Sequence, residues 1–377
     1  MIHRWTGWSP DDAGVTWLPL YHDMGVIGCL LTSVTAQTDG WLMSPEHFIQ
    51  DPMRWLACLG DGRAGLTAAP TFGFSYALHR MSPERLTGLD FSTWRVAIVG
   101  AERVDAAVLG EFAAVLRPHG FSPATFRPAY GLAEATLAVT GAQQEGPPTA
   151  VRPEWGKLRV GERVPITDER AVGTGDPPGR GEGWLVGCGA PLAGVGLTVV
   201  DSAGRALPDG HLGELTVTGP SVAAGYRGGD PIGSSRFLED RLCTGDAGFV
   251  RDGEVFVLGR IGDSFKVRGR AVYLEDLEAR VAEELGLSPA RCALVAFTGG
   301  EGPRLALLAE TRPGTWTARA VPFIQRLVGD AIPVTVLTGR RGLIRRGTSG
   351  KPRRRAMWED LQAGRLPGTV VASWPSA

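Results

Sequence analysis

The amino-acid sequence predicts an α/β fold in which a large first part is followed by a small α+β unit. Three observations predict it. A buried strand is followed closely by a helix in the first third of the chain, the hydrophobic period changes to two after residue 184, and helix and strand patterns alternate again after residue 263. We therefore expect a large domain at residues 1–262, including a β-rich subdomain at about 184–262, and a small C-terminal domain at 263–377.

The strand and helix of the first part lie on either side of a glycine-containing turn. Residues 94–99 form an apolar, β-branched run, Asp105 can cap a helix that extends to Leu116, and Pro118 ends it. Such a unit builds parallel sheets, and ligands in open α/β sheets collect at the turn that follows the strand. The turn Gly100-Ala101-Glu102 is therefore a candidate binding site.

The middle of the chain changes from a polar stretch to short strands. Residues 143–183 are rich in Gly, Pro and charge, which predicts a long surface insertion. Beyond it, residues 197–200, 214–218 and 254–258 alternate apolar and polar side chains between turn residues, which predicts β-strands. We expect a hinge at Gly262-Asp263, where this pattern ends.

The last third of the chain predicts a compact α+β unit. Helices are expected near residues 275–285 and 318–328, and strands near 292–297, 304–310 and 333–337.

Composition excludes several function classes. The formal net charge is −1, which gives no global attraction to nucleic acid or to an anionic membrane. The five cysteines are widely spaced with no Cys-x-x-Cys pair, which favours a reducing compartment, and no run of about 18 apolar residues predicts a membrane span. We therefore expect a cytoplasmic protein with no integral membrane segment and no nucleic-acid partner.

Lysine is rare, and two of its positions are informative. Of the 39 basic residues only three are lysines, which leaves 36 arginines. Lys351 closes the flexible turn Gly347-Thr-Ser-Gly-Lys351, and Lys266 lies in the stretch from Gly259 to Gly269. An ammonium is a compact charge that reaches a phosphate or a carboxylate where a planar guanidinium does not fit. The alternative is that an arginine-rich genome left three lysines at random.

Three more segments carry candidate chemistry: Trp17-Leu-Pro-Leu-Tyr-His-Asp-Met-Gly25, Tyr130-Gly-Leu-Ala-Glu-Ala-Thr136 and Thr244-Gly-Asp246. Taken alone, His22 can be a core histidine, Glu134 a helix cap and Asp246 a turn residue. Their order, followed by the stretch from Arg260 and by the Lys351 turn, resembles the adenylate-forming enzymes. The first two segments are most similar to those of fatty acyl-AMP ligases.

The resemblance implies a reaction and its participants. Such enzymes join a fatty or other carboxylic acid to the α-phosphate of ATP, release pyrophosphate, and pass the acyl group from the adenylate to a thiol. Negative charge gathers at the α-phosphate in the first step. The expected cofactors are ATP, with AMP in the adenylate, and Mg²⁺.

The resemblance also implies roles for residues at the matching positions. Lys351 matches the catalytic lysine, Glu134 the catalytic carboxylate that holds Mg²⁺, and His22 the histidine beside the acyl carboxylate. Tyr130, Gly131 and the turn Gly100-Ala101-Glu102 correspond to the adenine pocket, and Asp246 and Arg260 to the groups that bind the ribose hydroxyls. Asp263 corresponds to the hinge about which the small domain turns, which would exchange Lys351 for the loop from Lys266 to Gly269.

The resemblance leaves the acceptor and the first step open. The acceptor is expected to be the phosphopantetheine thiol of an acyl carrier protein, the alternatives being coenzyme A, as in an acyl-CoA synthetase, or no transfer at all in a non-catalytic adenylate-binding scaffold. The superfamily's phosphate-gripping loop, expected upstream of Trp17, is absent from this sequence. Either the chain starts upstream, or a partner chain completes the fold, or the protein is a short form. Without that loop we expect weak adenylation by the chain alone, and exposed apolar surface where those elements would pack.

Overall fold

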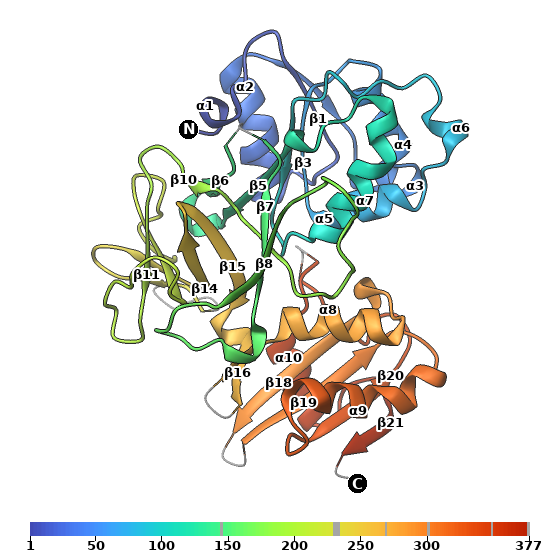
Figure 1. Cartoon of the computed structure of the whole chain (residues 1–377), viewed down its shortest axis with the longest axis vertical. Helices are drawn as coiled ribbons and strands as arrows, with labels where there is room; N and C mark the ends of the chain where they lie inside the picture. The colour runs from blue at the N-terminus through green and yellow to red at the C-terminus, as the bar shows by residue number, and fades with distance from the viewer. Residues whose placement is uncertain (144–145, 229–233, 268–269, 300–301, 348–349, 375–377) are drawn as a thin grey trace.

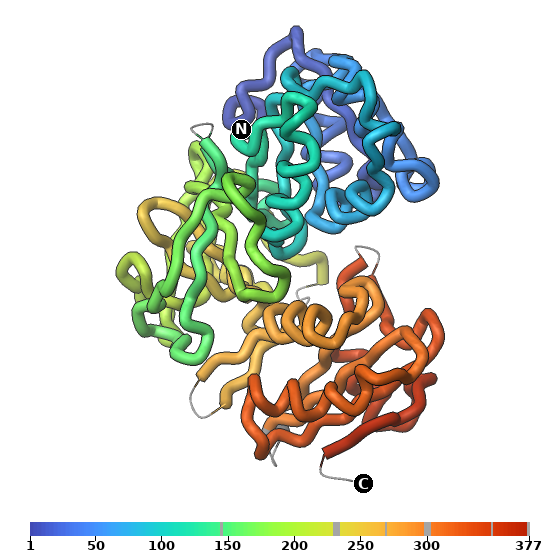
Figure 2. Tube along the Cα trace, turned by 45° about the vertical axis from the view of Figure 1, so that its right-hand side comes forward, coloured from blue at the N-terminus to red at the C-terminus, as the bar shows by residue number. Residues whose placement is uncertain are grey.

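The computed structural model describes residues 1–143, 146–228, 234–267, 270–299, 302–347 and 350–374. Within these ranges the chain forms one large sheet with helices, two smaller sheets beside it, and a C-terminal part that begins at residue 264 (Figure 1). The C-terminal part lies at the opposite end of the molecule from the N-terminus. Figure 2 shows that its first helix, α8 (Leu274–Leu285), lies on the side that faces the rest of the chain.

The large sheet has the strand order β10-β6-β5-β4-β3-β1-β2. Its strands are β1 (Ala13–Thr16), β2 (Asp39–Leu42), β3 (Leu66–Ala69), β4 (Val96–Val99), β5 (Phe126–Gly131), β6 (Ala138–Gly141) and β10 (Ala190–Pro191). The first five strands pair in parallel, and β6 and β10 add antiparallel. The predicted parallel sheet is therefore confirmed, and its strands end at a common edge, as in other α/β folds.

Short helices connect the parallel strands. They are α1 (Ile2–Thr6), the π-helix η1 (Met24–Leu31), α2 (Thr32–Ala36), α3 (Pro45–Gln50), α4 (Met53–Gly60), α5 (Thr71–Leu78), α6 (Pro83–Leu86) and α7 (Ala106–Leu116), with 3₁₀ turns η2 (Arg117–His119), η3 (Pro123–Thr125) and η4 (Ala133–Ala135). Figure 1 shows α4, α5 and α7 on one side of the strands and α1 and α2 on the other. The predicted cap of α7 is confirmed, because the Asp105 carboxylate accepts a hydrogen bond from the Ala107 amide at 2.9 Å.

Aromatic side chains fill the core beneath α4, α5 and α7. The ring of Trp94 lies 5.7 Å from that of Trp55, 6.0 Å from that of Phe112 and 5.1 Å from that of Phe121, in edge-to-face arrangements. These side chains are almost completely buried. Edge-to-face packing is favourable because it places the positive rim of one ring against the negative face of another.

Two sheets make up the β-rich middle of the chain. The three-stranded sheet contains β7 (Thr149–Pro153), β8 (Ile166–Ala171) and β9 (Leu185–Val186), with η5 (Trp155–Lys157) after β7. The five-stranded sheet contains β11 (Gly196–Val200), β12 (Gly213–Thr218), β13 (Arg236–Phe237), β14 (Leu242–Arg251) and β15 (Glu254–Arg260). The prediction that 143–183 is a surface insertion is wrong for its middle, because β7 buries Ala150 and Val151 completely. Two adjacent apolar residues in a polar stretch were enough to build a central strand.

The C-terminal part has a sheet with helices on both faces. It follows the 3₁₀ turn η6 (Ile261–Asp263). It contains the hairpin β16 (Ser264–Val267) and β17 (Arg270–Tyr273), then β18 (Cys292–Gly299), β19 (Gly302–Ala309), β20 (Val334–Thr338) and β21 (Thr369–Trp374), the helices α8, α9 (Thr315–Val328) and α10 (Arg354–Gln362), and the 3₁₀ turn η7 (Pro289–Arg291). Leu305 and Leu307 of β19 pack in the cluster of α8 and α9, whereas Ala306 and Leu308 pack with Trp358 of α10. Successive residues of the strand thus face opposite helices. The predicted elements of this part are confirmed, while α10 and β21 had not been predicted.

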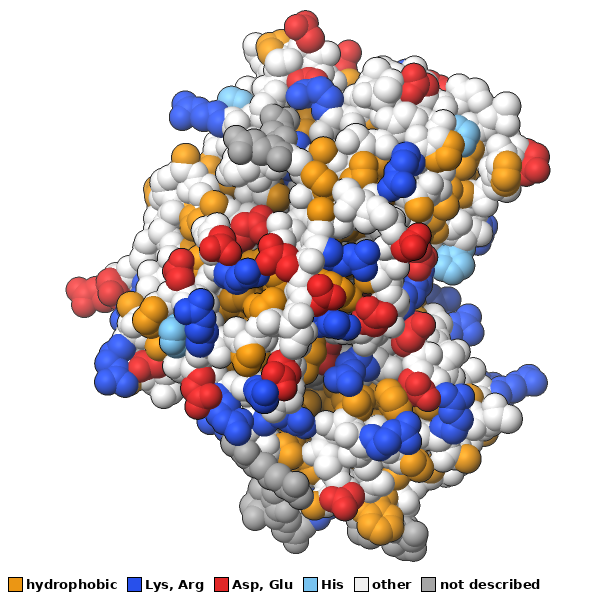
Figure 3. Space-filling model, in the orientation of Figure 1, with side chains coloured by type: hydrophobic (Ala, Val, Ile, Leu, Met, Phe, Trp, Pro, Cys, Tyr) orange, Lys and Arg blue, Asp and Glu red, His pale blue; other side chains and the backbone are white. Residues whose placement is uncertain are grey.

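Apolar side chains are exposed at one edge of the large sheet. All four residues of the edge strand β2 are exposed, including Trp41 and Leu42, and Leu31 and Val34 are exposed on the neighbouring helices. Apolar surface is thus exposed at this edge, and its assignment to elements upstream of Trp17 stays a prediction. Elsewhere, Figure 3 shows acidic and basic side chains interspersed across the middle of the face it presents. Within the described ranges, none of the helices has the length and apolar character needed to cross a bilayer.

Candidate active site

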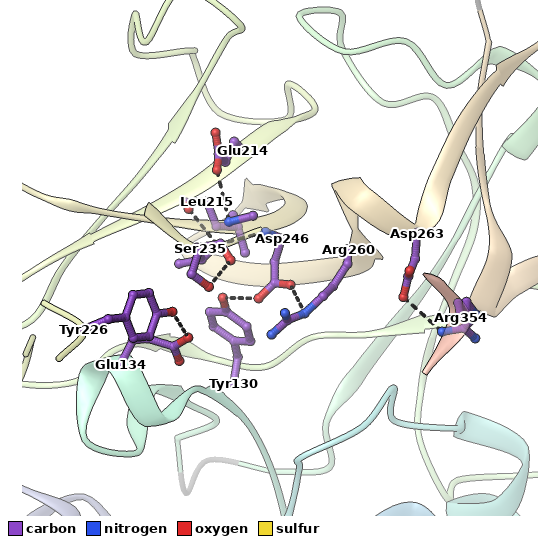
Figure 4. A network of polar contacts seen from close by, with 12 residues as sticks. Tyr130, Glu134, Glu214, Leu215, Tyr226, Ser235, Asp246, Arg260, Asp263 and Arg354 are labelled. Atoms are coloured by element: carbon purple, nitrogen blue, oxygen red, sulfur yellow. Dashed lines mark hydrogen bonds and ion pairs between the residues drawn. The ribbon is translucent and has the colours of Figure 1, made fainter. Parts of the chain in front are cut away.

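A hydrogen-bonded group joins the large sheet to the five-stranded sheet. The hydroxyl of Tyr130, near the end of β5, donates a hydrogen bond to Asp246 Oδ2 at 2.7 Å, and Arg260 Nε lies 3.4 Å from Asp246 Oδ1 (Figure 4). Asp246 and Arg260 are cross-strand neighbours in β14 and β15. The structure thus brings together three residues that the sequence analysis had proposed for the nucleoside.

The backbone around Asp246 is held in place by polar contacts. The Asp246 amide donates to Thr244 Oγ1 at 3.1 Å, and that hydroxyl donates to the Leu215 carbonyl at 2.8 Å. Gly245 has a φ of +72°, which a glycine adopts without strain, and its amide donates to Glu214 Oε1 at 3.0 Å. The Thr-Gly-Asp segment therefore presents the aspartate in one conformation.

Burial and neighbouring charges set the pKa values of Asp246 and Tyr130. Burial raises the pKa of Asp246, while Arg260, the Tyr130 hydroxyl and Lys351 lower it. The pKa of Tyr130 is raised well above its ordinary value by burial and by the neighbouring carboxylate of Asp246. Tyr130 therefore remains protonated and acts as a donor.

Glu134 lies beside this group, on the 3₁₀ turn η4. Its Oε1 accepts a hydrogen bond from the Tyr226 hydroxyl at 2.6 Å, as Figure 4 shows. Among the described residues its second oxygen, Oε2, has no hydrogen-bond partner, and no group of three or more His, Cys, Asp or Glu side chains that could hold a metal is found in them. One half-exposed carboxylate fits Mg²⁺, which is commonly bound by one or two carboxylates together with substrate phosphates and waters.

A strained turn fixes the position of Glu134. Thr136 has φ +69° and ψ −54°, and the Leu137 amide donates to the Ala135 carbonyl at 2.8 Å, which closes a γ-turn. This conformation is unfavourable for a β-branched residue. It is held by the Thr136 hydroxyl, which donates to the Ser221 carbonyl at 2.8 Å, and by the amide of Ala223, which donates to the Glu134 carbonyl at 2.8 Å.

The predicted turn after β4 approaches β5 closely. A Cβ atom on Gly100 would lie 2.9 Å from the Ala129 carbonyl oxygen, so the position requires glycine. Glu102 Oε1 accepts a hydrogen bond from the Phe72 amide at 2.7 Å. The surrounding protein raises the pKa of Glu102 to about 7, while the Phe72 amide and Lys351 act in the opposite direction. The cause of the raised pKa is burial of the carboxyl, although other atoms of the residue are exposed.

Lys351, from the far end of the sequence, acts electrostatically on carboxyls of this site. Its ammonium lowers the pKa of both Glu102 and Asp246, so it lies within electrostatic reach of carboxyls from two other sheets. The lysine is exposed, and the Gly347 amide donates to its carbonyl at 2.9 Å, which closes the turn. Thr348 and Ser349 of this turn, and Arg268 and Gly269 of the Lys266 loop, lie outside the described residues.

The predicted hinge is tied directly to the segment that follows Lys351. Arg354 is almost fully buried, and it donates to Asp263 Oδ2 at 3.0 Å, to Glu278 Oε2 at 3.1 Å and to the Leu294 carbonyl at 3.1 Å. Figure 4 shows the contact between Asp263 and Arg354 to one side of the Tyr130 group. Asp263 is therefore held by the C-terminal part in this orientation.

His22 lies apart from these contacts. Its Nδ1 is 2.6 Å from Asp23 Oδ1, and that carboxylate also accepts a hydrogen bond from the Met24 amide at 2.8 Å, at the start of η1. Among the described residues, no polar contact connects His22 to Tyr130 or Asp246. Its place beside an acyl carboxylate therefore stays a prediction.

Sequence reasoning missed Tyr226 and Arg354. Tyr226 lies in a polar loop before β13, and Arg354 is the middle residue of a run of three arginines at 353–355. Nothing in the local sequence distinguishes the buried arginine from its exposed neighbours. Only the contacts made by the folded chain separate them.

Comparison with known proteins agrees with this geometry. The fold is that of the adenylate-forming enzymes, and the family model described as AMP-binding enzyme matches residues 1–227. The chain therefore belongs to the AMP-binding enzyme family.

Similar sequences include a protein named long-chain-fatty-acid–AMP ligase FadD26 of Mycobacterium tuberculosis. It is 32% identical, and the match covers 93% of this chain and 62% of that protein. A protein named 4-hydroxyphenylalkanoate adenylyltransferase, of Mycobacterium bovis, is 33% identical over 92% of this chain and 57% of its own length. The chain thus spans about three fifths of the length of these curated relatives.

Similar solved structures carry related descriptions. One, from a study of fatty acyl-adenylate ligases from E. coli and L. pneumophila, has a TM-score of 0.81 and 29% identity, and the match covers 96% of this chain and 64% of that one. Another is a fatty acyl-adenylate ligase from L. pneumophila in complex with acyl adenylate and pyrophosphate. It has a TM-score of 0.61 and 25% identity, over 99% of this chain and 66% of that one.

Proposed function

We propose that this chain acts in an acyl-AMP-forming ligase that activates a fatty or related carboxylic acid with ATP. The acyl group then passes from the adenylate to the phosphopantetheine thiol of an acyl carrier protein. The observation that carries the proposal is the convergence of Tyr130, Asp246 and Arg260 with Lys351, which belongs to a different part of the fold. The names of the similar proteins support a carboxylic acid as the substrate.

The first half-reaction forms a mixed anhydride. A carboxylate oxygen of the acid attacks the α-phosphorus of ATP, the bond from that phosphorus to the bridging oxygen breaks, and pyrophosphate leaves. Lys351 would neutralise the charge that gathers on the α-phosphate, since its ammonium is an exposed cation that acts on both Asp246 and Glu102. Mg²⁺, which would be held by Glu134, supplies charge neutralisation to the phosphates when it is bound.

The nucleoside would be bound by the group that joins the two sheets. Asp246 offers carboxylate oxygens to ribose hydroxyls, and Arg260 beside it offers guanidinium donors. The Gly100 turn, which has no Cβ at its first position, would let a flat base approach the backbone. Tyr130 would orient Asp246 through its hydroxyl and cover the base with its ring.

The second half-reaction transfers the acyl group. The thiolate of the carrier's phosphopantetheine attacks the acyl carbon, the bond to the phosphate oxygen breaks, and AMP leaves. We place the boundary between a large domain and a small domain at residues 262 and 263, with Asp263 as the hinge, because η6 ends there and the next hairpin belongs to the C-terminal part. Rotation about this point would remove Lys351 and open a path for the thiol.

The test is acyl transfer to a holo carrier protein, followed by intact-protein mass spectrometry. One reaction receives a pre-formed acyl adenylate, and a parallel reaction receives ATP, Mg²⁺ and the free acid. Transfer from both sources supports both half-reactions, and transfer from the adenylate alone supports the second. In a third reaction coenzyme A replaces the carrier protein. Faster acyl transfer to coenzyme A than to the carrier would identify coenzyme A as the acceptor. Transfer in none of the three would overturn the proposal.

A further inference from the structure

One side chain of the Gly100 turn crosses from the large sheet to the C-terminal part. Arg103 directly follows Glu102, and its Nη1 donates to Asp276 Oδ1 at 3.3 Å, in the first turn of α8. Its Nη2 donates to the Trp184 carbonyl at 3.1 Å, and its guanidinium carbon lies 5.2 Å from the centre of the Trp155 ring. One guanidinium thus contacts the end of the three-stranded sheet and α8 at the same time.

The partner of Arg103 is a buried carboxylate. Asp276 is only 5% exposed, and burial raises its pKa while Arg103 and Arg280 lower it. Arg280 lies one turn further along α8, and its Nη1 is 3.7 Å from Asp276 Oδ2. The contact with Arg280 stays within the helix, whereas the contact with Arg103 exists only in this orientation of the C-terminal part.

A buried carboxylate that loses a charged partner is strongly destabilised. Moving α8 away from the large sheet would separate Asp276 from Arg103, whereas the contacts of Arg103 with Trp184 and Trp155 lie outside the C-terminal part and would remain. The ion pair with Asp276 therefore favours this orientation of α8, and the contacts with Trp184 and Trp155 hold the Arg103 guanidinium in place to make it. In that arrangement Lys351 lies within reach of Asp246 and Glu102.

We propose that Arg103 is a positioning residue that latches α8, and with it Lys351, in the orientation seen here. The latch acts through Asp276, and it makes no contact with Lys351 itself. It lies one residue from Glu102, so a ligand at the Gly100 turn and the orientation of the C-terminal part share one short segment. This inference rests on the proposed function only for the role of Lys351, and its structural part stands independently.

The first experiment measures the arrangement without any activity. Hydrogen exchange and small-angle X-ray scattering are compared for the full chain and for the Arg103→Gln variant. We expect the amides of α8 to exchange about tenfold faster in the variant, and the radius of gyration to increase. Arg152→Gln is the matched control, because Arg152 likewise lies over an indole ring, that of Trp184 at 5.4 Å, but pairs with Asp168 of β8. It should leave α8 unchanged.

A second variant keeps the test decisive if the first folds poorly. Asp276→Asn removes the charge with little change of volume, and it should increase exchange in α8 by a similar factor. Combining it with Arg103→Gln should increase the exchange rate little further, because both changes remove the same ion pair. Unchanged exchange and scattering in both single variants would overturn the latch, whatever the activity.

The activity assay then separates the latch from the proposed function. Arg103→Gln should lower adenylation from ATP about tenfold while transfer from a pre-formed adenylate changes by less than about twofold. An equal loss in both reactions would assign Arg103 a general structural role and overturn the positioning role. If the unmodified protein shows neither reaction, the proposed function fails while the exchange and scattering results still decide the latch.

Discussion

Arg354 binds the carboxylate of Asp263 at 3.0 Å across 91 residues of sequence, and it lies three positions after Lys351. The lysine turn and the proposed hinge are therefore connected through one buried guanidinium. Since the same group also binds Glu278, its removal would leave two carboxylates without their cation.

Replacing Arg354 should therefore destabilise the protein. We expect Arg354→Ala to lower the free energy of unfolding by about 3–5 kcal/mol, as for other broken buried ion pairs, measured by urea denaturation. Arg355→Ala is the control, because Arg355 is exposed and, among the residues that the structure describes, pairs with Glu359 alone, one turn away. Arg355→Ala should lower the free energy of unfolding by less than about 0.5 kcal/mol. Equal effects of the two changes would contradict the structural role of Arg354.

Lys351→Ala should separate catalysis from binding. If the ammonium stabilises charge at the α-phosphate, adenylation should fall at least about 100-fold while the Kd for AMP changes by less than about threefold. The measurements are pyrophosphate exchange and calorimetric titration with AMP. Lys157→Ala is the matched control, because it removes an exposed ammonium that pairs with Glu154 and to which no role at the site has been assigned. An active Lys351→Ala protein would refute the assigned role.

Tyr130→Phe should weaken nucleotide binding. The change removes the hydroxyl that donates to the buried Asp246 and leaves that oxygen without its partner, so we expect a loss of about 1–2 kcal/mol in AMP affinity, or about tenfold in Kd. Tyr76→Phe is the control, since its hydroxyl donates to the Ile49 carbonyl and not to the site. Identical AMP affinity in the Tyr130→Phe variant would show that the nucleoside binds elsewhere.

Glu102 should make stability depend on pH between about 4.5 and 7. Its pKa is raised from 4.5 to about 7, so the folded state binds the proton more tightly than the unfolded state, and this contribution to stability is lost as the pH rises through 7. Glu102→Gln keeps the oxygen that accepts from Phe72 and removes the titration. Between pH 5 and pH 8, the free energy of unfolding of the variant should rise by about 1 kcal/mol relative to that of the unmodified protein, after allowance for solvent screening. Parallel stability curves for the two proteins would contradict the raised pKa.

The sequence predicted the elements that depend on local patterns. The strand of β4, the cap at Asp105 and the alternation of β11, β12 and β15 follow from periodicity and capping chemistry, and the structure confirms them. Motif order was enough to place Tyr130, Asp246 and Arg260 near one another, because the fold of a known family fixes how those segments meet.

What the sequence did not predict depends on long-range burial. Ala150 and Val151 make a buried strand only because β8 and β9 pair on either side of β7. Arg103 and Arg354 resemble the other arginines in the sequence, and their roles follow from carboxylates 173 and 91 positions away. Local propensity carries no information about such partners.

The scarcity of lysine has a chemical consequence for an enzyme of the proposed kind. A mixed anhydride is an acylating agent, and amines are the side chains that it modifies most readily, whereas guanidinium groups stay protonated and unreactive at neutral pH. With three lysines against 36 arginines, the chain offers its own product few targets besides Lys351. The arginine side chains of such an enzyme would thus resist self-acylation, and Lys351 would keep an amine at the proposed site.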